Sequence, residues 1–468
     1  MHDFFEQVES LQQSYATILC LGLDPRPHYL TEADRQAENP LAAWGERMLR
    51  ETADYICCVK PNSAFYEAQG SYGWEALKQT IAIAHEIGIP VLLDAKRGDI
   101  GSTAEAHAVA AFHELEADAI TLSPYLGRDT MQPFLKVAGR GLFVLCHTSN
   151  PSADDVQLLD VQGRSLYEVV AERATQWSDR IGLVVGATYP HAIAAVREAA
   201  PEAWLLLPGV GAQGADEKAA IAAAGQRMIV PVSRGIIAAD DPRQAARELR
   251  DKLNRAADRS VAAPAPALSR RQQAVAETLL SIGAVRFGQF TLASGAQSPF
   301  YIDLRLLASH PRALSLVARA IGDLIAEKAL DFDVLAALPY GALPIGVAVS
   351  LQSGDPLIYP RKEVKGYGTQ RQIEGIYEAG QVALVLDDLV TTGGTKVKGA
   401  EPLRHAGLTV NDIVVLIDRS GGGAATELAT HGMALHAVLT MEAMIDHLAT
   451  QDLISAEQRK TVARYLAG

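Results

Sequence analysis

The chain has 468 residues, of which 49% are hydrophobic and 21% are charged, and it carries a formal net charge of −13. This length exceeds one ordinary hydrophobic core, so we expect two globular domains. The acidic balance argues against a nucleic-acid partner, because phosphate backbones favour basic surfaces.

The sequence also argues against a membrane protein, a secreted protein and a protein with a structural metal site. No apolar run is long enough to span a bilayer, and the N-terminus lacks the basic and apolar regions of a secretory signal. The four cysteines form no C-x-x-C pair, and the twelve histidines show no metal-ligand spacing. We therefore expect a cytoplasmic enzyme with reduced core cysteines and without a metal site built from protein ligands alone.

Residues 1–257 alternate short apolar runs with helical patterns, such as those at 73–87 and 165–180. The runs are almost continuously apolar, as in parallel strands that are buried on both faces. Eight βα units in about 250 residues predict a (β/α)8 TIM barrel. The predicted strands are 17–23, 56–60, 90–94, 119–122, 142–146, 182–186, 204–207 and 229–232.

Polar residues collect where these strands end, at the face that carries the active site in such barrels. Asp94 and Lys96 are two residues apart, so they point to the same side of an extended segment, and Asp99 follows them. Carboxylates on both sides keep a lysine cationic, which favours a catalytic centre over a surface salt-bridge cluster. The other strand-end residues are Asp24, Lys60, Ser123, Ser149, Gln213 and Arg234.

The segment DAKRGDI at 94–100, followed by Thr103, resembles the D-x-K-x-x-D signature of the orotidine 5′-monophosphate decarboxylases. The segments at 21–24, 59–67, 208–214 and 232–235 are similar to other motifs of that family, in the same order. The resemblance implies decarboxylation of orotidine monophosphate to UMP without a cofactor. Lys96 would stabilise and protonate a carbanion at carbon 6, and Asp94 would lie near the departing carboxylate.

The same resemblance implies roles for the remaining polar residues. Asp24 and Lys60 would hold the ribose hydroxyls and the charge network, and Ser149 would contact the pyrimidine. Asp99 and Thr103 would enter the active site of a neighbouring subunit. The phosphate would be bound by Gln213, Arg234 and the amide of Gly235.

Residues 258–268 (DRSVAAPAPAL) are predicted to form an extended connector, because alternating proline and alanine disfavour a helix. The second domain, 269–468, shows helical stretches between most of its candidate strands. This alternation predicts an open, mainly parallel α/β sheet with binding loops after the strand ends. The predicted strands are 334–338, 356–359, 382–386, 413–417 and 434–439.

An acidic and Thr/Gly-rich loop follows the predicted strand at 382–386. Two carboxylates suit ribose hydroxyls, and a Thr/Gly loop before a helix suits a phosphate. The loop is not a Walker A motif, because no Gly-Lys-Ser/Thr follows its glycines. Its residues are Asp387, Asp388, Thr391, Thr392, Gly393, Gly394 and Thr395.

This loop resembles the PRPP-binding signature of the type I phosphoribosyltransferases, and the segments 290–305, 339–344, 361–368 and 418–419 resemble orotate phosphoribosyltransferase motifs. The resemblance implies that pyrophosphate on PRPP is displaced by a ring nitrogen of orotate, with Mg²⁺ carried mainly by PRPP. Arg361, Lys362 and Lys365 would act at the pyrophosphate, and Arg419 would pair with the orotate carboxylate. Ala293 and Gly341 stand where much of the family has lysine.

The two implied reactions are consecutive, which favours a bifunctional enzyme that makes UMP from orotate and PRPP. Shared sites in both families imply a homodimer or a larger homo-oligomer. One alternative makes the first domain a sugar-phosphate decarboxylase or aldolase, and the other makes the second domain a PRPP-sensing module.

Overall fold

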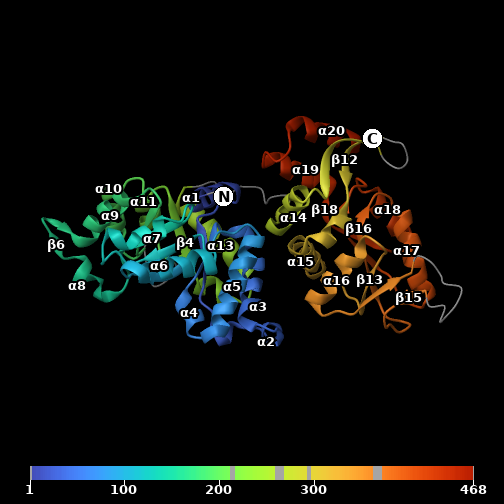
Figure 1. Cartoon of the computed structure of the whole chain (residues 1–468), viewed down its shortest axis with the longest axis horizontal. Coiled ribbons are helices and arrows are strands. Elements are labelled where there is room, and N and C mark those ends of the chain that lie inside the picture. Colours follow the sequence, from blue (N-terminus) through green and yellow to red (C-terminus); the bar gives the residue numbers. More distant parts are fainter. Residues whose placement is uncertain (1–2, 211–216, 259–267, 292–296, 362–371, 467–468) are drawn as a thin grey trace. The chain divides into compact units, whose positions relative to one another are not determined.

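The computed structural model describes residues 3–210, 217–258, 268–291, 297–361 and 372–466. The chain folds into two compact units, Met1–Pro266 and Ala267–Gly468, and both are α/β structures (Figure 1). The predicted connector at 258–268 falls almost wholly outside the described residues, so the domain boundary remains a prediction. No helix in the described part is long and apolar enough to cross a membrane.

The first unit is built on eight parallel strands, in the order β2-β1-β10-β9-β8-β5-β4-β3. Parallel bridges Val59–Val91 and Asn62–Asp94 bring β2 and β3, the two ends of the sheet, together. The predicted TIM barrel is therefore confirmed, and each predicted apolar run overlaps one strand. The strands are β1 (Leu19–Leu23), β2 (Cys58–Pro61), β3 (Leu92–Arg97), β4 (Ala119–Leu122), β5 (Gly141–His147), β8 (Ile181–Val185), β9 (Leu205–Leu206) and β10 (Met228–Val232).

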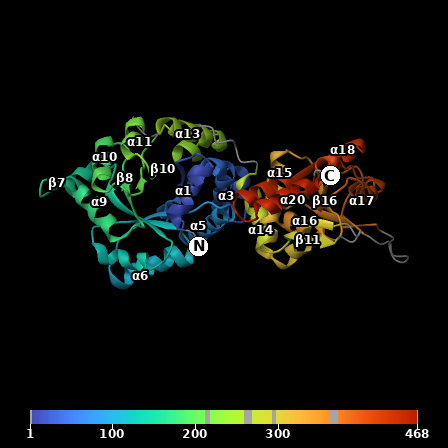
Figure 2. The ribbon, with the colours of Figure 1, turned by 90° about the horizontal axis from the view of Figure 1, so that it is seen from above.

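Helices surround these strands (Figure 2). The helix predicted at 165–180 ends at Trp177, and it begins after Ser165, which forms a capping box with Glu168. The helices are α1 (Phe4–Ser14), α2 (Glu32–Gln36), α3 (Pro40–Thr52), α4 (Ser63–Glu67), α5 (Gly70–Glu86), α6 (Gly101–Val109), α7 (Gln132–Leu135), α8 (Asp154–Gln157), α9 (Leu166–Trp177), α10 (Pro190–Ala199), α11 (Glu217–Ala224), α12 (Arg234–Ile237) and α13 (Pro242–Ala256). A small hairpin, β6 (Asp160–Val161) and β7 (Arg164–Ser165), lies between α8 and α9.

Helix α1 closes the N-terminal end of the barrel. Phe4 packs edge-on against Phe143, and Phe5 stacks on Trp204 with ring centroids 5.5 Å apart. These rings share an apolar cluster with three buried cysteines, Cys20, Cys57 and Cys58, and all four cysteines of the chain are free thiols. With one end filled by aromatic side chains, the opposite end, where the strands terminate, is left for polar groups.

The second unit contains a six-stranded sheet in the order β15-β14-β13-β16-β17-β18, parallel except for β14–β15. The five predicted strands are present, whereas the two-residue β15 and the antiparallel pair β11–β12 were not predicted. The strands are β11 (Val285–Thr291), β12 (Gln297–Ile302), β13 (Val334–Ala337), β14 (Leu357–Pro360), β15 (Ile373–Glu374), β16 (Ala383–Val390), β17 (Asp412–Asp418) and β18 (Ala434–Thr440).

Alternate residues of the central strands belong to two different cores, so both faces of this sheet are covered. Leu384 and Leu386 pack with one group of helices, and Ala383 and Val385 pack with the other. The first group is α14 (Arg270–Ser281), α15 (Pro311–Glu327), α16 (Ala342–Ser353), α19 (Met441–Thr450) and α20 (Ala456–Leu466). The second group is α17 (Gly394–His405) and α18 (Gly423–Thr430).

Candidate functional site

A chain of three charged side chains lies at the C-terminal ends of β2 and β3. Lys60 Nζ donates to Asp94 Oδ2 over 2.6 Å, and Lys96 Nζ donates to Asp94 Oδ1 over 2.5 Å. The side chains of Asp94 and Lys60 are almost fully buried, whereas the Lys96 side chain is 49% exposed. Of these three side chains, the partly exposed Lys96 is therefore the one that a bound molecule can reach.

The pKa values show how strongly these charges depend on one another. Burial acts to raise the pKa of Asp94, but the two lysines overcome it and lower the pKa to about 2. Burial acts to lower the pKa of the Lys60 ammonium, but the charges of Asp94 and Asp24 raise it instead. At neutral pH the group therefore holds an ionised carboxylate beside a cationic Lys60.

The second predicted carboxylate, Asp99, does not pair with Lys96 in this chain. Asp99 accepts a hydrogen bond from the amide of Ile100 over 2.8 Å, and in the described part of the chain no ion pair involves it. Thr103 lies exposed in the first turn of α6. The expectation that carboxylates flank Lys96 on both sides is therefore met only by Asp94 within one chain.

A cavity of about 650 Å³ adjoins the Lys60–Asp94–Lys96 group. Asp24 and Lys60 line it, together with Ser233, Arg234 and Gly235 at the end of β10. One oxygen of Asp24 is buried without a hydrogen-bond partner in the described structure. Among the described residues no carboxylate pairs with Arg234, so its guanidinium is available to a ligand. This cavity combines an acceptor for hydroxyls with a cation for an anionic group.

The remaining predicted residues of the barrel are not all placed in this cavity. Ser149 is exposed two residues after β5 and does not line it. Gln213 lies outside the described residues, although Pro208, Gly209 and Val210, which precede its segment, line the cavity.

The second candidate site lies where β16 meets α17. The strand was expected to end at Leu386, but it continues through Val390 because β17 pairs with it as far as Asp418. Asp387 and Asp388 are consequently held on the paired strand, and the amide of Asp388 donates to Asp387 Oδ1 over 2.8 Å. Thr391, Thr392 and Gly393 then lead into the first turn of α17, which contains Gly394 and Thr395.

One buried lysine balances the two carboxylates only in part. Lys396, in the first turn of α17, forms an ion pair with Asp387. Burial raises the pKa of Asp388 to about 6, and the neighbouring charge of Asp387 acts in the same direction, whereas Lys396 opposes it. The site thus carries excess negative charge until a ligand brings cations or hydroxyl donors.

Gly341, at the start of α16, is in close contact with Asp388. A Cβ atom at position 341 would lie 2.0 Å from Asp388 Oδ2. A lysine, which much of the resembled family carries here, would therefore require Asp388 to move. Ala293, the other departure from the family pattern, lies outside the described residues.

The sequence has one predicted arginine before and one after the Asp387 and Asp388 carboxylates, and the two arginines differ in their contacts. The Arg419 guanidinium lies over the Phe300 ring, 5.0 Å from its centroid, and its Nε is buried without a hydrogen-bond partner in the described structure. Arg361, after β14, is held in an ion pair with Glu374. Lys362 and Lys365 lie outside the described residues, so their predicted role is not placed.

Sequence reasoning missed three residues. Lys396 directly follows the Thr/Gly loop and could have been found as a counterion for two adjacent carboxylates. Phe300, which supports Arg419, and Thr121 on β4, which hydrogen-bonds Asp94, gave no signal because each is one residue of an ordinary strand pattern.

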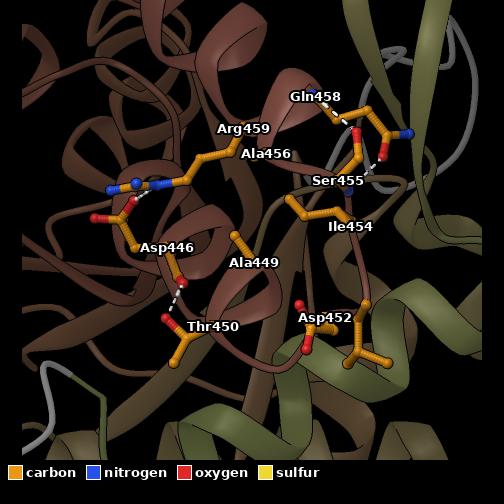
Figure 3. Close-up of a pocket in the computed structure, with 10 residues that line it drawn as sticks. Asp446, Ala449, Thr450, Asp452, Ile454, Ser455, Ala456, Gln458 and Arg459 are labelled. Atoms are coloured by element: carbon orange, nitrogen blue, oxygen red, sulfur yellow. Dashed lines mark hydrogen bonds and ion pairs between the residues drawn. The ribbon is translucent and has the colours of Figure 1, made fainter.

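A further hollow of about 670 Å³ lies between α19 and α20, but most of its polar side chains bond to other residues that line it (Figure 3). Arg459 pairs with Asp446 at 2.7 Å, and Ser455 and Gln458 cap the start of α20. It offers no group comparable to Lys96 or Arg419. Within the described residues, no three His, Cys, Asp or Glu side chains are grouped so that they could hold a metal ion.

Comparison with known proteins covers the whole chain. The model of the "Orotidine 5'-phosphate decarboxylase / HUMPS family" matches residues 17–249. The "Bifunctional enzyme PyrF/PyrE" of Nostoc sp. is 35% identical, and the match covers 97% of this chain and 98% of that protein. The "Orotidine 5'-phosphate decarboxylase" of Herpetosiphon aurantiacus is 50% identical over 50% of this chain and 89% of its own length. The structure of Leishmania donovani UMP synthase matches all of both chains with 42% identity and a TM-score of 0.50.

Proposed function

The chain belongs to the family of bifunctional enzymes that join orotidine 5′-phosphate decarboxylase to orotate phosphoribosyltransferase, and on this premise we propose how its residues divide the two reactions. The enzyme transfers the phosphoribosyl group of PRPP to orotate and decarboxylates the product to UMP. We assign the second step to residues 1–257 and the first to residues 269–468, with 258–268 as the connector. The observation that carries the assignment is the Lys60–Asp94–Lys96 chain at the open end of the barrel.

Lys96 is the proposed proton donor of the decarboxylase. Loss of CO₂ from carbon 6 of the pyrimidine leaves a localised carbanion, which an adjacent ammonium stabilises and then protonates. Asp94 fixes the ammonium through its 2.5 Å hydrogen bond and lies near the departing carboxylate. No cofactor is required for this step, because the fixed positive charge takes the place of an electron sink.

The cavity beside this chain is proposed to bind the rest of the nucleotide. Asp24 has a buried oxygen with no hydrogen-bond partner among the described residues, which can accept from a ribose hydroxyl, and Lys60 lines the same cavity. Arg234 and the amide of Gly235, joined by Gln213, would hold the phosphate, and Ser149 would contact the pyrimidine. Binding energy from the phosphate, far from carbon 6, would orient the base for reaction.

In the transferase, Asp387 and Asp388 are proposed to accept hydrogen bonds from the ribose hydroxyls of PRPP. Thr391, Thr392, Gly393, Gly394 and Thr395 would surround its 5-phosphate at the start of α17. Arg419 would pair with the orotate carboxylate, since its guanidinium is held on Phe300 and is not bonded to a carboxylate in the described structure. Arg361, Lys362 and Lys365 would act on the leaving pyrophosphate, and for Arg361 this requires release from Glu374.

Mg²⁺ is the proposed cofactor of the transferase, carried by PRPP. The residues fit this arrangement, since two adjacent carboxylates suit a cation-bearing ligand, whereas the described residues form no three-ligand metal cage. Bound with PRPP, the ion would offset the negative charge that develops on pyrophosphate. The described residues of the site supply the hydroxyl acceptors and the cation for orotate.

We further propose a cytoplasmic homodimer or larger homo-oligomer. Asp99 is partly exposed in the loop after β3 and Thr103 is exposed in the first turn of α6, and in the described structure neither forms a hydrogen bond or ion pair with Lys96, which suits residues that complete the site of a neighbouring subunit. Four free, buried cysteines are in keeping with a reducing compartment.

Separate assays of the two half-reactions test the assignment. Added orotidine monophosphate should lose CO₂ at the same rate with and without EDTA, whereas orotate consumption should require PRPP and stop in EDTA. Decarboxylation that EDTA abolishes, or orotate turnover that it spares, would contradict the proposed division of cofactors.

A further inference from the structure

Strand β3 bulges at the residues that carry the proposed chemistry. Leu93 pairs with Ile120 of β4, and the next paired residue, Arg97, aligns with Leu122. Four steps along β3 therefore match two steps along β4, and Asp94, Ala95 and Lys96 leave the regular ladder. Lys96 has a φ of +47°, a left-handed conformation that is uncommon for a lysine. A bulge of this kind re-aims side chains next to an active site, and the rest of the structure must hold it in place.

The Thr121 side chain supplies hydrogen bonds that the bulged segment has lost. Thr121 lies on β4 opposite the bulge and is 1% exposed. Its Oγ1 accepts from the amides of Ala95 and Lys96 over 3.0 and 2.9 Å. The same hydroxyl donates to Asp94 Oδ1 over 3.1 Å. One buried hydroxyl thus bonds to the backbone that carries Lys96 and to the carboxylate that fixes its ammonium.

We propose that Thr121 is a positioning residue of the decarboxylase, whose hydroxyl stabilises the β3 bulge and thereby aims Lys96 at the reacting carbon. The proposal rests on the proposed function of Lys96. The effect of Thr121 on Lys96 is indirect, because its hydroxyl bonds to the backbone of the bulge and to the Asp94 carboxylate. Small displacements of a proton donor are costly, since proton transfer and charge stabilisation need near-ideal geometry.

The chain itself offers a matched set of variants. Thr121→Val keeps the size and branching of the side chain but removes the hydroxyl, and it leaves the amides of Ala95 and Lys96 without the acceptor that they share. Thr121→Ser keeps the hydroxyl and loses only a methyl group. The transferase reaction, measured on the same preparation, serves as a control for concentration, and UMP binding by calorimetry reports whether the barrel is folded.

We expect T121V to lower the kcat of decarboxylation by ~10- to 100-fold, which corresponds to the loss of a hydrogen bond to a charged group. The KM for orotidine monophosphate and the affinity for UMP should change little, because the nucleotide is held mainly through its phosphate. T121S should restore most of kcat. If T121V does not bind UMP, T121C takes its place, since a thiol is a weak donor and acceptor of similar size.

Three results would overturn the proposal: full kcat in T121V, an equal loss in T121S and T121V, or a raised KM with unchanged kcat. Each would leave the proposed function intact, provided that the wild-type chain decarboxylates orotidine monophosphate. An inactive wild-type barrel would instead contradict the proposed function itself.

Discussion

The two candidate sites use the same residue types in opposite proportions. In the barrel, one carboxylate, Asp94, lies between two lysines, and its pKa falls to about 2. In the described part of the transferase unit, two adjacent carboxylates share one buried lysine, Lys396, and the pKa of Asp388 rises to about 6. Both groups lie in the C-terminal part of parallel strands, so the difference comes from the balance of charge rather than from the fold.

This difference matches the chemistry proposed for each site. A carbanion formed without a cofactor needs positive charge that is already fixed by the protein, and the Lys60–Asp94–Lys96 group has more cations than carboxylates. PRPP arrives with hydroxyl donors and bound Mg²⁺, so its site can be left with excess negative charge. The negative charge of the transferase site is therefore offset only when its ligand binds, whereas the decarboxylase site holds its cations before the substrate binds.

The largest expected effect comes from removing the exposed cation of the barrel. Lys96→Ala should lower decarboxylation by ~10³-fold or more, because the proton donor and the charge that stabilises the carbanion are lost together. Synthesis of orotidine monophosphate should continue, so this intermediate should accumulate when orotate, PRPP and Mg²⁺ are supplied. Near-normal UMP production, followed by chromatography, would show that Lys96 is not the proton donor.

The reciprocal change removes the negative charge of the other site. Asp387→Asn combined with Asp388→Asn should reduce PRPP-dependent orotate consumption by ~10²-fold or more, since both hydroxyl acceptors for the transition state are weakened. Decarboxylation of added orotidine monophosphate by the same preparation is the control and should be unchanged. Unaltered orotate turnover would remove the basis for the ribose-binding role.

A mixing experiment sharpens the comparison at the level of assembly. Asp99→Ala and Lys96→Ala chains should each be inactive in decarboxylation. After subunit exchange, random pairing into dimers should restore about a quarter of the wild-type activity, because one site of each mixed dimer is intact. Sedimentation and a tag on one chain would verify exchange. No recovery despite proven exchange, or a fully active monomer, would rule out shared sites.

The smallest effect concerns stability and should have opposite signs in the two units. Asp94 has a lowered folded pKa, so it stabilises the barrel above its unfolded pKa, and this stability is lost as pH falls towards 2. Asp388 has a raised folded pKa, so its contribution is present at low pH and is lost as pH rises through about 6. At pH 8, Asp94→Asn should lower the melting temperature of the barrel by about 5 °C, and Asp388→Asn should raise that of the transferase unit by a similar amount.

Calorimetry can assign the two unfolding transitions to the two units, because UMP should raise the melting temperature of the barrel only. Both differences should shrink at low pH, below about 4 for Asp388 and towards 2 for Asp94. A change of the same sign in both variants would contradict the proposed charge balance.

The sequence predicted most of the strands because these depend on local patterns, whereas β11, β12 and β15 were not predicted. Continuous apolar runs placed all eight barrel strands, and the polar residues Lys60 and Asp94, at the ends of two of these runs, are neighbours in space. The role of Thr121 could not be predicted, because it depends on the register between β3 and β4, which includes an irregular bulge. The extension of β16 to Val390 likewise depends on its partner β17.

Other omissions have different physical causes. Helix α1 fills the end of the barrel through Phe4 and Phe5, and its packing partners, such as Phe143 and Trp204, are distant in sequence. The contact between Gly341 and Asp388 joins the start of α16 to strand β16, and no pattern within either segment indicates it. Lys396 was within reach of sequence reasoning, since two adjacent buried carboxylates require a counterion.

The most direct test of two complementary sites on one chain is a coupled assay with orotate labelled in its carboxyl group. The purified wild-type chain, given PRPP and Mg²⁺, should release labelled CO₂, pyrophosphate and UMP in equal amounts, and without PRPP it should release no label. Pyrophosphate release without labelled CO₂, or no orotate consumption by a chain that decarboxylates added orotidine monophosphate, would contradict this account.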